Sequence, residues 1–141
     1  MQIQLAETDD QIAACFPVMA ELRPHLVSSE FVARVRRQER DGFQLAYASD
    51  LERTLAVAGF RLMEKLVTGP TLYVDDLVTS DGARSRGYGH ELFAWLVATA
   101  RARGCSALEL DSGVQRFAAH RFYLANRMDI TSHHFAMKLS R

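Results

Sequence analysis

The chain has 141 residues, and its 17 basic and 17 acidic side chains leave a formal net charge of zero, which gives no support to nucleic-acid or membrane-surface binding. A hydrophobic content of 48% with 24% charged residues is typical of a globular protein, and the length predicts one domain over residues 1–141. The sequence shows neither a signal peptide nor an apolar run of the ~20 residues that span a bilayer, and its two distant cysteines predict free thiols. A cytoplasmic protein without membrane contact is therefore expected.

The first part of the chain is predicted to contain a short strand followed by two helices. Residues 2–5 alternate in polarity as a strand does, and Thr8 with the two aspartates after it offers N-cap candidates for a helix. Pro17 lies inside that helix, where its missing N–H and its steric clash predict a kink or a break. A second helix is expected from Ser28, with an arginine-rich face toward solvent.

Three strands are predicted next. Residues 44–48 and 54–66 are separated by a short polar turn and should pair antiparallel, and Gly59 inside the second strand predicts a bulge or a close backbone approach. Residues 72–79 form an apolar strand that is interrupted by Asp75 and Asp76. Two carboxylates in such a strand are costly to bury, so they need either ion-pair partners or a chemical task.

A turn with two glycines connects this strand to an amphipathic helix over residues 90–103. The turn consists of Arg84, Ser85, Arg86, Gly87, Tyr88 and Gly89. Its glycines lack the side chains that would keep a ligand away from the backbone. The first amide groups of the helix lack intrahelical partners and lie at the positive end of the helix dipole. Together with the two arginines, these features predict a site for a phosphate or pyrophosphate.

The helix over residues 90–103 should pack on the sheet through an apolar stripe, whereas Trp95 lies off that stripe and is available to another element, a partner subunit or solvent. Residues 107–110 are predicted to form a strand. A homodimer is compatible with Trp95 and with an edge strand at the C-terminus.

The last helix is predicted over residues 115–126 and a final alternating strand over residues 130–139. One side of this helix is apolar, and Tyr123 lies on the other side among arginines. The tyrosine is therefore not expected to fill the core.

Two segments of the sequence match a known pattern. The turn fits Arg/Gln-x-x-Gly-x-Gly/Ala, and residues 119–128 fit Ala-x-x-x-Tyr-x-x-x-Gly-Phe, with Arg127-Met128 in place of Gly-Phe. In both motifs, and in the order and distance between them, the sequence resembles the GCN5-related N-acetyltransferase (GNAT) family. The resemblance implies the GNAT acyl-CoA N-acyltransferase fold, an α/β (α+β) fold with a twisted, mixed, mostly antiparallel sheet and helices on both faces.

The resemblance also implies where acetyl-CoA, the cosubstrate, would bind. It would enter where the neighbouring parallel strands over residues 72–79 and 106–111 splay apart, with its pyrophosphate on the turn. The residues expected to bind it are Leu77, Val78, Thr79, Arg84, Ser85, Arg86, Gly87, Tyr88, Gly89, Arg116 and His120. Arg116 stands where many family members have an asparagine that bonds the cofactor arm. His120 is expected either to touch the cofactor, to order Tyr123, or to be a surface histidine.

The resemblance assigns two catalytic roles. Tyr123 corresponds to the family tyrosine that protonates the departing thiolate. For the base that takes a proton from the amine, we choose Asp75 or Asp76, with preference for Asp75 and with Glu64 as a third candidate. Because adjacent strand residues point to opposite faces, we expect at most one of the two aspartates to face the acceptor directly.

The function predicted from the resemblance is direct transfer of an acetyl group from acetyl-CoA to a primary amine of a small molecule, whose binding site would lie between about Arg23 and Arg40. The alternatives are acetylation of a protein amino group, an inactive acyl-CoA-binding regulatory module of the same fold, and a nucleotide-binding switch domain. No metal is expected, because the adjacent residues His133 and His134 face apart on a strand and no paired cysteines are present.

Overall fold

The computed structural model of this protein describes residues 1–140, which form two units that are described separately: residues 1–109 and residues 110 onward. The prediction of a single domain therefore stays a prediction. The first unit holds three α-helices and the strands of one sheet, the last of which ends at Leu110. In chain order they are β1 (Gln2–Leu5), α1 (Asp9–Leu22), α2 (Ser28–Glu39), β2 (Phe43–Asp50), β3 (Arg53–Lys65), β4 (Gly69–Thr79), a 3₁₀ turn (Asp81–Ala83), α3 (Tyr88–Ala102) and β5 (Ala107–Leu110).

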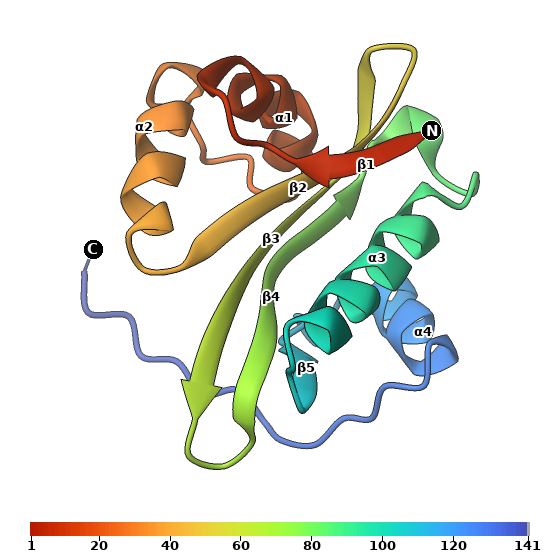
Figure 1. The fold of residues 1–141 in the computed structure, drawn as a ribbon. Helices are drawn as coiled ribbons and strands as arrows, with labels where there is room; N and C mark the ends of the chain where they lie inside the picture. Colours follow the sequence, from red (N-terminus) through yellow and green to blue (C-terminus); the bar gives the residue numbers. More distant parts are fainter. Residues whose placement is uncertain (141) are drawn as a thin grey trace. The chain divides into compact units, whose positions relative to one another are not determined.

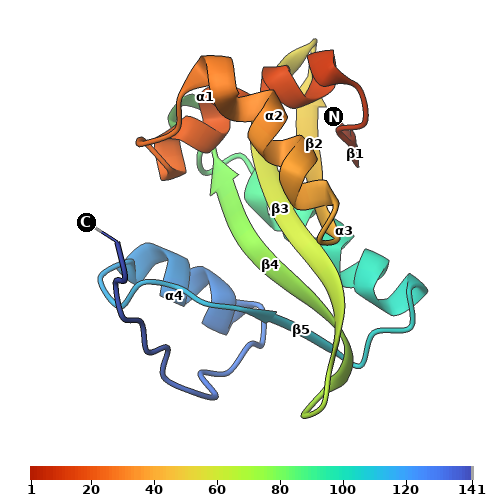
Figure 2. The same cartoon turned by 90° about the vertical axis from the view of Figure 1, so that its left-hand side faces the viewer.

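The five strands form one sheet in the order β1-β2-β3-β4-β5, and the first three neighbouring pairs are antiparallel. Helices α1 and α2 lie on one face of this sheet and α3 lies on the other (Figure 1). The view in Figure 2, turned by 90°, shows α2 in front of the strands and α3 behind them. The predicted mostly antiparallel sheet with helices on both faces is confirmed.

Side-chain alternation along the strands explains the two layers. On β2, Phe43, Leu45 and Tyr47 belong to the apolar core under α1 and α2, together with Ile12 and Phe31 from those helices. The positions between them point to the other face, because successive side chains alternate. That face carries small buried residues that pair across β2 and β3: Ala46, Ala48, Ala56 and Ala58. Their small size lets α3 approach the sheet closely.

Helix α3 packs on this second face as predicted, through the buried residues Leu92, Phe93, Leu96 and Ala100. Trp95, which lies off the stripe, places its ring 6.0 Å from the ring of Phe60 on β3 in an edge-to-face contact. Of the three surroundings predicted for Trp95, contact with another element is therefore the one observed.

Helix α1 begins with a capping box in which the Thr8 hydroxyl accepts from the Gln11 N–H and the Gln11 side chain accepts from the Thr8 N–H. The helix runs unbroken through Pro17, so the predicted break does not occur. Buried side chains on both sides of the proline, among them Cys15 and Met19, anchor both halves of the helix to the core. This packing outweighs the local cost of the proline.

A β-bulge on β4 changes the direction of its side chains. Gly59 pairs with Asp76 and Phe60 pairs with Val74, so Asp75 is an extra residue without a direct partner on β3. The predicted bulge is thus confirmed, and so is the close approach: a Cβ atom on Gly59 would lie 2.6 Å from Phe43 Cζ and 2.7 Å from Asp76 Oδ2. Only glycine leaves both side chains in place.

The second unit contains one helix, α4 (Phe117–Ala125). None of its residues is fully buried, because a unit this short has little apolar surface with which to cover a helix. The final strand predicted over residues 130–139 is wrong: residues 130–140 form no strand. Their alternating apolar side chains are exposed, as shown by Phe135 and Leu139, and alternation by itself cannot make a strand without an edge to pair with.

Among residues 1–140, no helix has both the length and the apolar character that crossing a bilayer requires.

Replacement of Gly59 by alanine tests the bulge. We expect Gly59→Ala to lower the free energy of unfolding by about 1–3 kcal/mol, because the new methyl group displaces the Phe43 ring and the Asp76 carboxylate. Urea denaturation followed by circular dichroism measures this difference. Gly82→Ala is the control, since a Cβ atom at Gly82 would meet nothing within 4 Å. Equal stability of the two variants would contradict the close packing at Gly59.

Candidate active site

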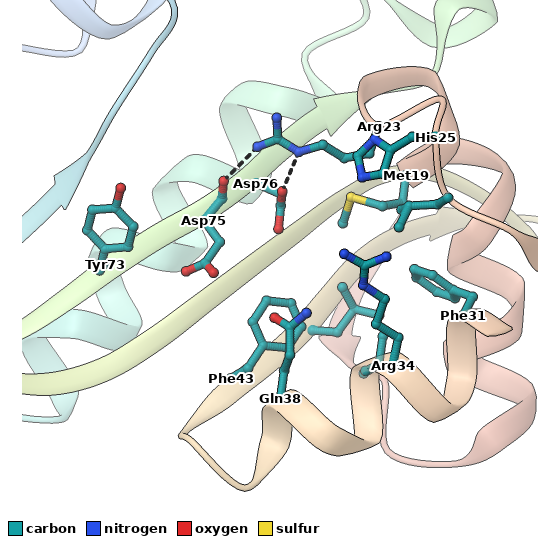
Figure 3. A pocket seen from close by; sticks show the side chains of 13 residues that line it. Met19, Arg23, His25, Phe31, Arg34, Gln38, Phe43, Tyr73, Asp75 and Asp76 are labelled. Carbon is teal, nitrogen blue, oxygen red and sulfur yellow. Dashed lines mark hydrogen bonds and ion pairs between the residues drawn. The ribbon is translucent and has the colours of Figure 1, made fainter. Parts of the chain in front are cut away.

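A cavity of about 420 Å³ lies on the face of the sheet that α1 and α2 cover, and Asp75 and Asp76 both line it. We call it the Asp75–Asp76 cavity. Its opposite wall comes from the end of α1, from α2 and from the connection between them (Figure 3). The segment between Arg23 and Arg40, where an acceptor site is predicted, therefore contributes to the wall of this cavity, and binding of an acceptor there stays a prediction.

The expectation that the two aspartates face apart is wrong. The bulge at Asp75 shifts the alternation by one residue, so that Tyr73 and Asp75 face the cavity before it and Asp76 faces the cavity after it. Further along β4, Val78 joins the apolar core under α1 and α2, which follows from the same shift. The bulge therefore brings two carboxylates to one wall.

The Asp75 carboxylate is held by Arg61, whose Nε lies 2.9 Å from Oδ2 and 3.2 Å from Oδ1. The same guanidinium donates to Gln38 Oε1 on α2 at 2.8 Å. The pKa of Asp75 is raised, first by burial and also by the charge of Asp76, while the hydrogen bond and the charge of Arg61 oppose this change. Asp75 is therefore a stronger proton acceptor than an ordinary aspartate.

Arg23 holds the second carboxylate. Its Nε donates to Asp76 Oδ1 at 2.8 Å, and its Nη2 donates to the backbone oxygen of Asp75 at 3.1 Å (Figure 3). One arginine at the end of α1 thus contacts both residues of the bulge. The ion-pairing partners that a buried carboxylate needs are present for Asp75 and for Asp76 alike.

Glu64, the third candidate for the base, is far from the cavity. It is exposed and pairs with Pro70, whereas Asp76 pairs with Gly59. Five residues of strand separate these positions along β3, roughly 17 Å. The structure thus groups Asp75 with Asp76 and leaves Glu64 outside.

The predicted anion-binding turn connects β4 to α3 and is open to solvent. Gly87 is the N-cap of α3 and has a left-handed backbone with φ of 86°, and Ser85 has φ of 67°. Arg84, Ser85, Arg86 and Gly87 are all exposed. Arg84 forms an exposed ion pair of 2.9 Å with Asp81, so part of its charge is offset locally.

The second glycine of the turn has a packing role. A Cβ atom on Gly89 would lie 2.7 Å from the Thr79 hydroxyl oxygen, so glycine allows the first turn of α3 to touch the end of β4. The expected cofactor residues Leu77, Val78 and Thr79 therefore lead directly into the turn. On one side, their backbone pairs with residues 56–58 of β3.

The other edge of this strand end lies beyond the reach of β5. That strand spans four residues, and it is attached near the beginning of β4: Ser106 N donates to Pro70 O at 2.8 Å, and Lys65 Nζ lies 2.7 Å from Glu109 Oε1. Four residues extend roughly 13 Å, whereas Pro70 and Thr79 are roughly 30 Å apart along β4. This arrangement agrees with the predicted splaying of the two neighbouring strands.

In the second unit, Tyr123 lies on α4, half-buried, with its ring 5.5 Å from that of Phe122 in an edge-to-face contact. Burial raises the pKa of Tyr123, and the charge of Arg116 opposes this effect. The hydroxyl therefore stays protonated at neutral pH. Arg116 is the N-cap residue of α4, and the His120 ring nitrogen Nε2 lies 2.9 Å from the Gly113 carbonyl oxygen. His120 thus contacts the segment before the helix.

Residues 6–127 match the family model for the acetyltransferase (GNAT) family. The chain belongs to the GNAT acetyltransferase family. This GNAT protein is therefore an acyl-CoA-dependent acetyltransferase, as the resemblance in its motifs predicted.

Relatives of this GNAT protein agree with the assignment. It is 31% identical over 115 residues to the uncharacterized N-acetyltransferase YhdJ of Bacillus subtilis strain 168, and the match covers 81% of each chain. A transcriptional regulator from Bacillus halodurans C-125 shares its fold with a TM-score of 0.87 at 20% identity, covering 98% of this chain and 99% of the other. AAC(6')-Iy in complex with the bisubstrate analog CoA-S-monomethyl-acetylneamine has a TM-score of 0.85 at 13% identity, covering 99% and 98%.

The GNAT family uses acetyl-CoA, and the turn of this chain fits the diphosphate of such a molecule. Gly87, the N-cap of α3, has a left-handed backbone, and a Cβ atom there would meet nothing within 4 Å, so the backbone at this end of the helix is open to an anion. Arg86 adds an exposed positive charge.

Sequence reasoning missed the residues that hold the two carboxylates. Arg61 could have been found, because a charged residue directly after the buried run Leu55–Phe60 needs a partner in the same way as Asp75 does. Gln38 and Arg23 carried no such signal. They lie 37 and 53 residues before Asp75 and Asp76, respectively, on other elements, and only the packing of α1 and α2 on the sheet brings them there.

A metal site is not seen among the described residues, where no group of three or more His, Cys, Asp and Glu side chains could hold an ion. His134 lies 3.4 Å from Asp111 instead. That the enzyme works without a metal stays a prediction.

Substitution of Gly87 tests the turn. We expect Gly87→Val to weaken coenzyme A binding at least tenfold, because valine disfavours a φ of 86° and adds a branched side chain where the anion would approach. Isothermal titration with coenzyme A measures the affinity. Gly104→Val is the matched control: Gly104 also has a positive φ of 72°, but it follows α3 at the opposite end of the helix. A similar affinity loss in both variants would show that general destabilisation, rather than the turn, is responsible.

Proposed function

We propose that this GNAT enzyme transfers the acetyl group of acetyl-CoA directly to a primary amine of a small molecule that binds in the Asp75–Asp76 cavity. The observation that carries this proposal is the cavity itself, in which the bulge turns two carboxylates toward one space. The cavity lies on the same strand, β4, whose end leads into the anion-binding turn.

The size of the cavity favours a small acceptor. Its volume of about 420 Å³ falls within the range of roughly 300–1,000 Å³ that is common for small-molecule pockets. Carboxylates, arginines and aromatic side chains line it together, which suits an organic amine with both polar and apolar parts. A protein amino group remains the variant in which only one side chain or chain end enters this space.

The residues of the turn, from Arg84 to Gly89, would hold the diphosphate through backbone N–H groups and positive charge, and the backbone of residues 77–79 would pair with the pantetheine arm. Arg116 and His120 are proposed as further cofactor contacts from α4. When bound, acetyl-CoA supplies a thioester whose carbonyl carbon the amine attacks.

We assign the base to Asp75. An alkyl ammonium has no lone pair, so the amine must lose a proton before it can form the new bond to carbon. Burial raises the pKa of Asp75, which brings the carboxylate closer to the range in which it can accept that proton. Asp76, paired with Arg23, would hold the ammonium group near Asp75.

We assign the general acid to Tyr123, which donates its hydroxyl proton to the departing thiolate. Its raised pKa keeps the proton on the phenol at neutral pH, as a general acid requires. The matching position of Tyr123 in the second motif of the family supports the same role.

Direct transfer is favoured over a covalent acyl-enzyme because neither cysteine suits a nucleophile. Cys15 is completely buried in the core, and burial raises its pKa to about 12, so its thiol is neutral under ordinary conditions. Cys105 is half-buried between α3 and β5 and does not line the cavity.

Purified protein with acetyl-CoA and a panel of amines tests the proposal. Release of free thiol that depends on a small amine, with the acetylated amine detected by mass spectrometry, is the expected result. Binding of acetyl-CoA without turnover on any amine would favour the regulatory module, and turnover only with peptides or proteins would favour the protein-directed variant. A preference for ATP or GTP over coenzyme A in titration calorimetry would favour the nucleotide-binding switch.

Removal of the Tyr123 hydroxyl should slow the reaction. We expect Tyr123→Phe to lower kcat by roughly 10²-fold with little change in the affinity for coenzyme A, since the ring and its packing on Phe122 remain. Steady-state kinetics and calorimetry measure the two quantities. Tyr47→Phe is the control, because it removes a hydroxyl that contacts Gln4 on β1. An unchanged kcat in Tyr123→Phe would remove this tyrosine from the mechanism.

Three substitutions separate the candidate bases. We expect Asp75→Asn to lower kcat/KM by roughly 10²-fold at neutral pH, Asp76→Asn to act mainly on KM, and Glu64→Gln to have no effect. The neutral fraction of the amine rises with pH. If Asp75 is the base, the loss of kcat/KM in Asp75→Asn should therefore become smaller toward pH 9. A deficit independent of pH would indicate that Asp75 has only a structural role with Arg61.

A further inference from the structure

The charges around the Asp75–Asp76 cavity do not balance. Asp75 is paired with Arg61 and Asp76 with Arg23, so these four groups sum to zero. Arg34 on α2 also lines the cavity, and it has no ion-pair or hydrogen-bond partner among the described residues. Among the aspartates and arginines at the cavity, there is therefore one excess positive charge before any acceptor enters.

Arg34 is directed toward the cavity from the side opposite to the aspartates. Figure 3 shows its guanidinium group rising from α2 into the space that Asp75 and Asp76 border from β4. The other two arginines of α2 differ in this respect. Arg36 is bound to Asp9 and Glu39, and Arg37, which is exposed as Arg34 is, does not line the cavity. Arg34 is thus the arginine of α2 that an acceptor in the cavity would meet.

A simple ammonium ion would add a further positive charge and leave Arg34, which is exposed to solvent, without a counter-charge. A second, anionic group on the acceptor would supply that counter-charge. A carboxylate carries one negative charge, which balances the single charge of Arg34, and its planar geometry suits two parallel hydrogen bonds from a guanidinium. A phosphate group, with nearly two negative charges, carries more negative charge than the single positive charge of Arg34 can neutralise.

The rest of the lining is largely apolar. It includes Met19, Leu26, Phe31, Phe43, Leu45 and Tyr73. Such a surface favours a hydrocarbon or aromatic portion on the acceptor.

We propose that the acceptor is an amino carboxylic acid with an apolar body, whose amine lies at Asp75 and Asp76 and whose carboxylate binds Arg34. The proposal rests on the acetyltransferase function proposed above and narrows its acceptor class. The same charge balance disfavours amines with several positive charges, such as polyamines and aminoglycosides. This is a difference from AAC(6')-Iy, which shares the fold and whose bound analog contains a neamine group.

Acceptor pairs that differ only in the carboxylate test the proposal. Phenylalanine is compared with 2-phenylethylamine, and 6-aminohexanoate with pentylamine, with spermidine and O-phosphoethanolamine as further acceptors. We expect at least one carboxylate-bearing member to exceed its counterpart in kcat/KM by roughly tenfold or more, which is the scale of one charge-assisted hydrogen-bonded pair. A preference for the decarboxylated amines, for spermidine or for the phosphate would overturn the carboxylate assignment.

Arg34→Gln identifies the group that recognises the carboxylate. We expect the preference for the carboxylate-bearing acceptor to fall at least tenfold, because KM rises for that acceptor and falls for the decarboxylated amine once the charge of Arg34 is removed. Arg37→Gln, on the same helix but outside the cavity, should keep the preference. Retention of the preference in Arg34→Gln would overturn the role of Arg34.

These outcomes distinguish the two levels of the proposal. Turnover of amines without any carboxylate preference overturns the acceptor class and leaves the acetyltransferase function standing. Absence of turnover on every amine, with acetyl-CoA still bound, overturns the proposed function itself and with it the acceptor class.

Discussion

The bulge at Asp75 is the constraint on which the candidate active site depends. One extra residue on β4 shifts the alternation of its side chains and turns two carboxylates toward the same cavity. The shift is possible because Gly59 opposite has no side chain, so the Phe43 ring and the Asp76 carboxylate can occupy the space of its missing Cβ. A regular strand would direct Asp75 to α1 and α2 and Asp76 to the face of α3. Without the bulge, the cavity would hold one carboxylate.

Two arginines from outside β4 offset the cost of burying the two carboxylates. Arg61 and Arg23 supply the hydrogen bonds that Asp75 and Asp76 require when they leave water. Asp75 can still act as a proton acceptor in this pair, because burial raises its pKa despite the presence of Arg61. Arg34, which also lines the cavity, has no such partner among the described residues. The aspartates on β4 are paired with arginines, whereas Arg34 on α2 is not. The wall at β4 is therefore proposed to bind an amine, and the wall at α2 a carboxylate.

Local features were the ones that the sequence predicted well. The N-cap at Thr8 and the bulge opposite Gly59 were each predicted from one or a few neighbouring residues. The predicted final strand over residues 130–139 was wrong because its alternation says nothing about whether a partner edge is available. The expectation that Asp75 and Asp76 face apart was wrong for a related reason. A bulge was foreseen from Gly59, but which residue on the neighbouring strand becomes the extra one is decided by pairing register.

The sequence by itself determined the GNAT family, because the motif around Gly87 and Gly89 and the motif around Tyr123 are each contained in a few consecutive residues whose backbone conformation is local. The tertiary structure alone decided which side chains share the cavity. Arg23, Arg34 and Gln38 are far in sequence from the two aspartates, and they line the same cavity only after α1 and α2 have packed on the sheet. Packing of that kind depends on the summed burial of many side chains, so it cannot be predicted from any single residue.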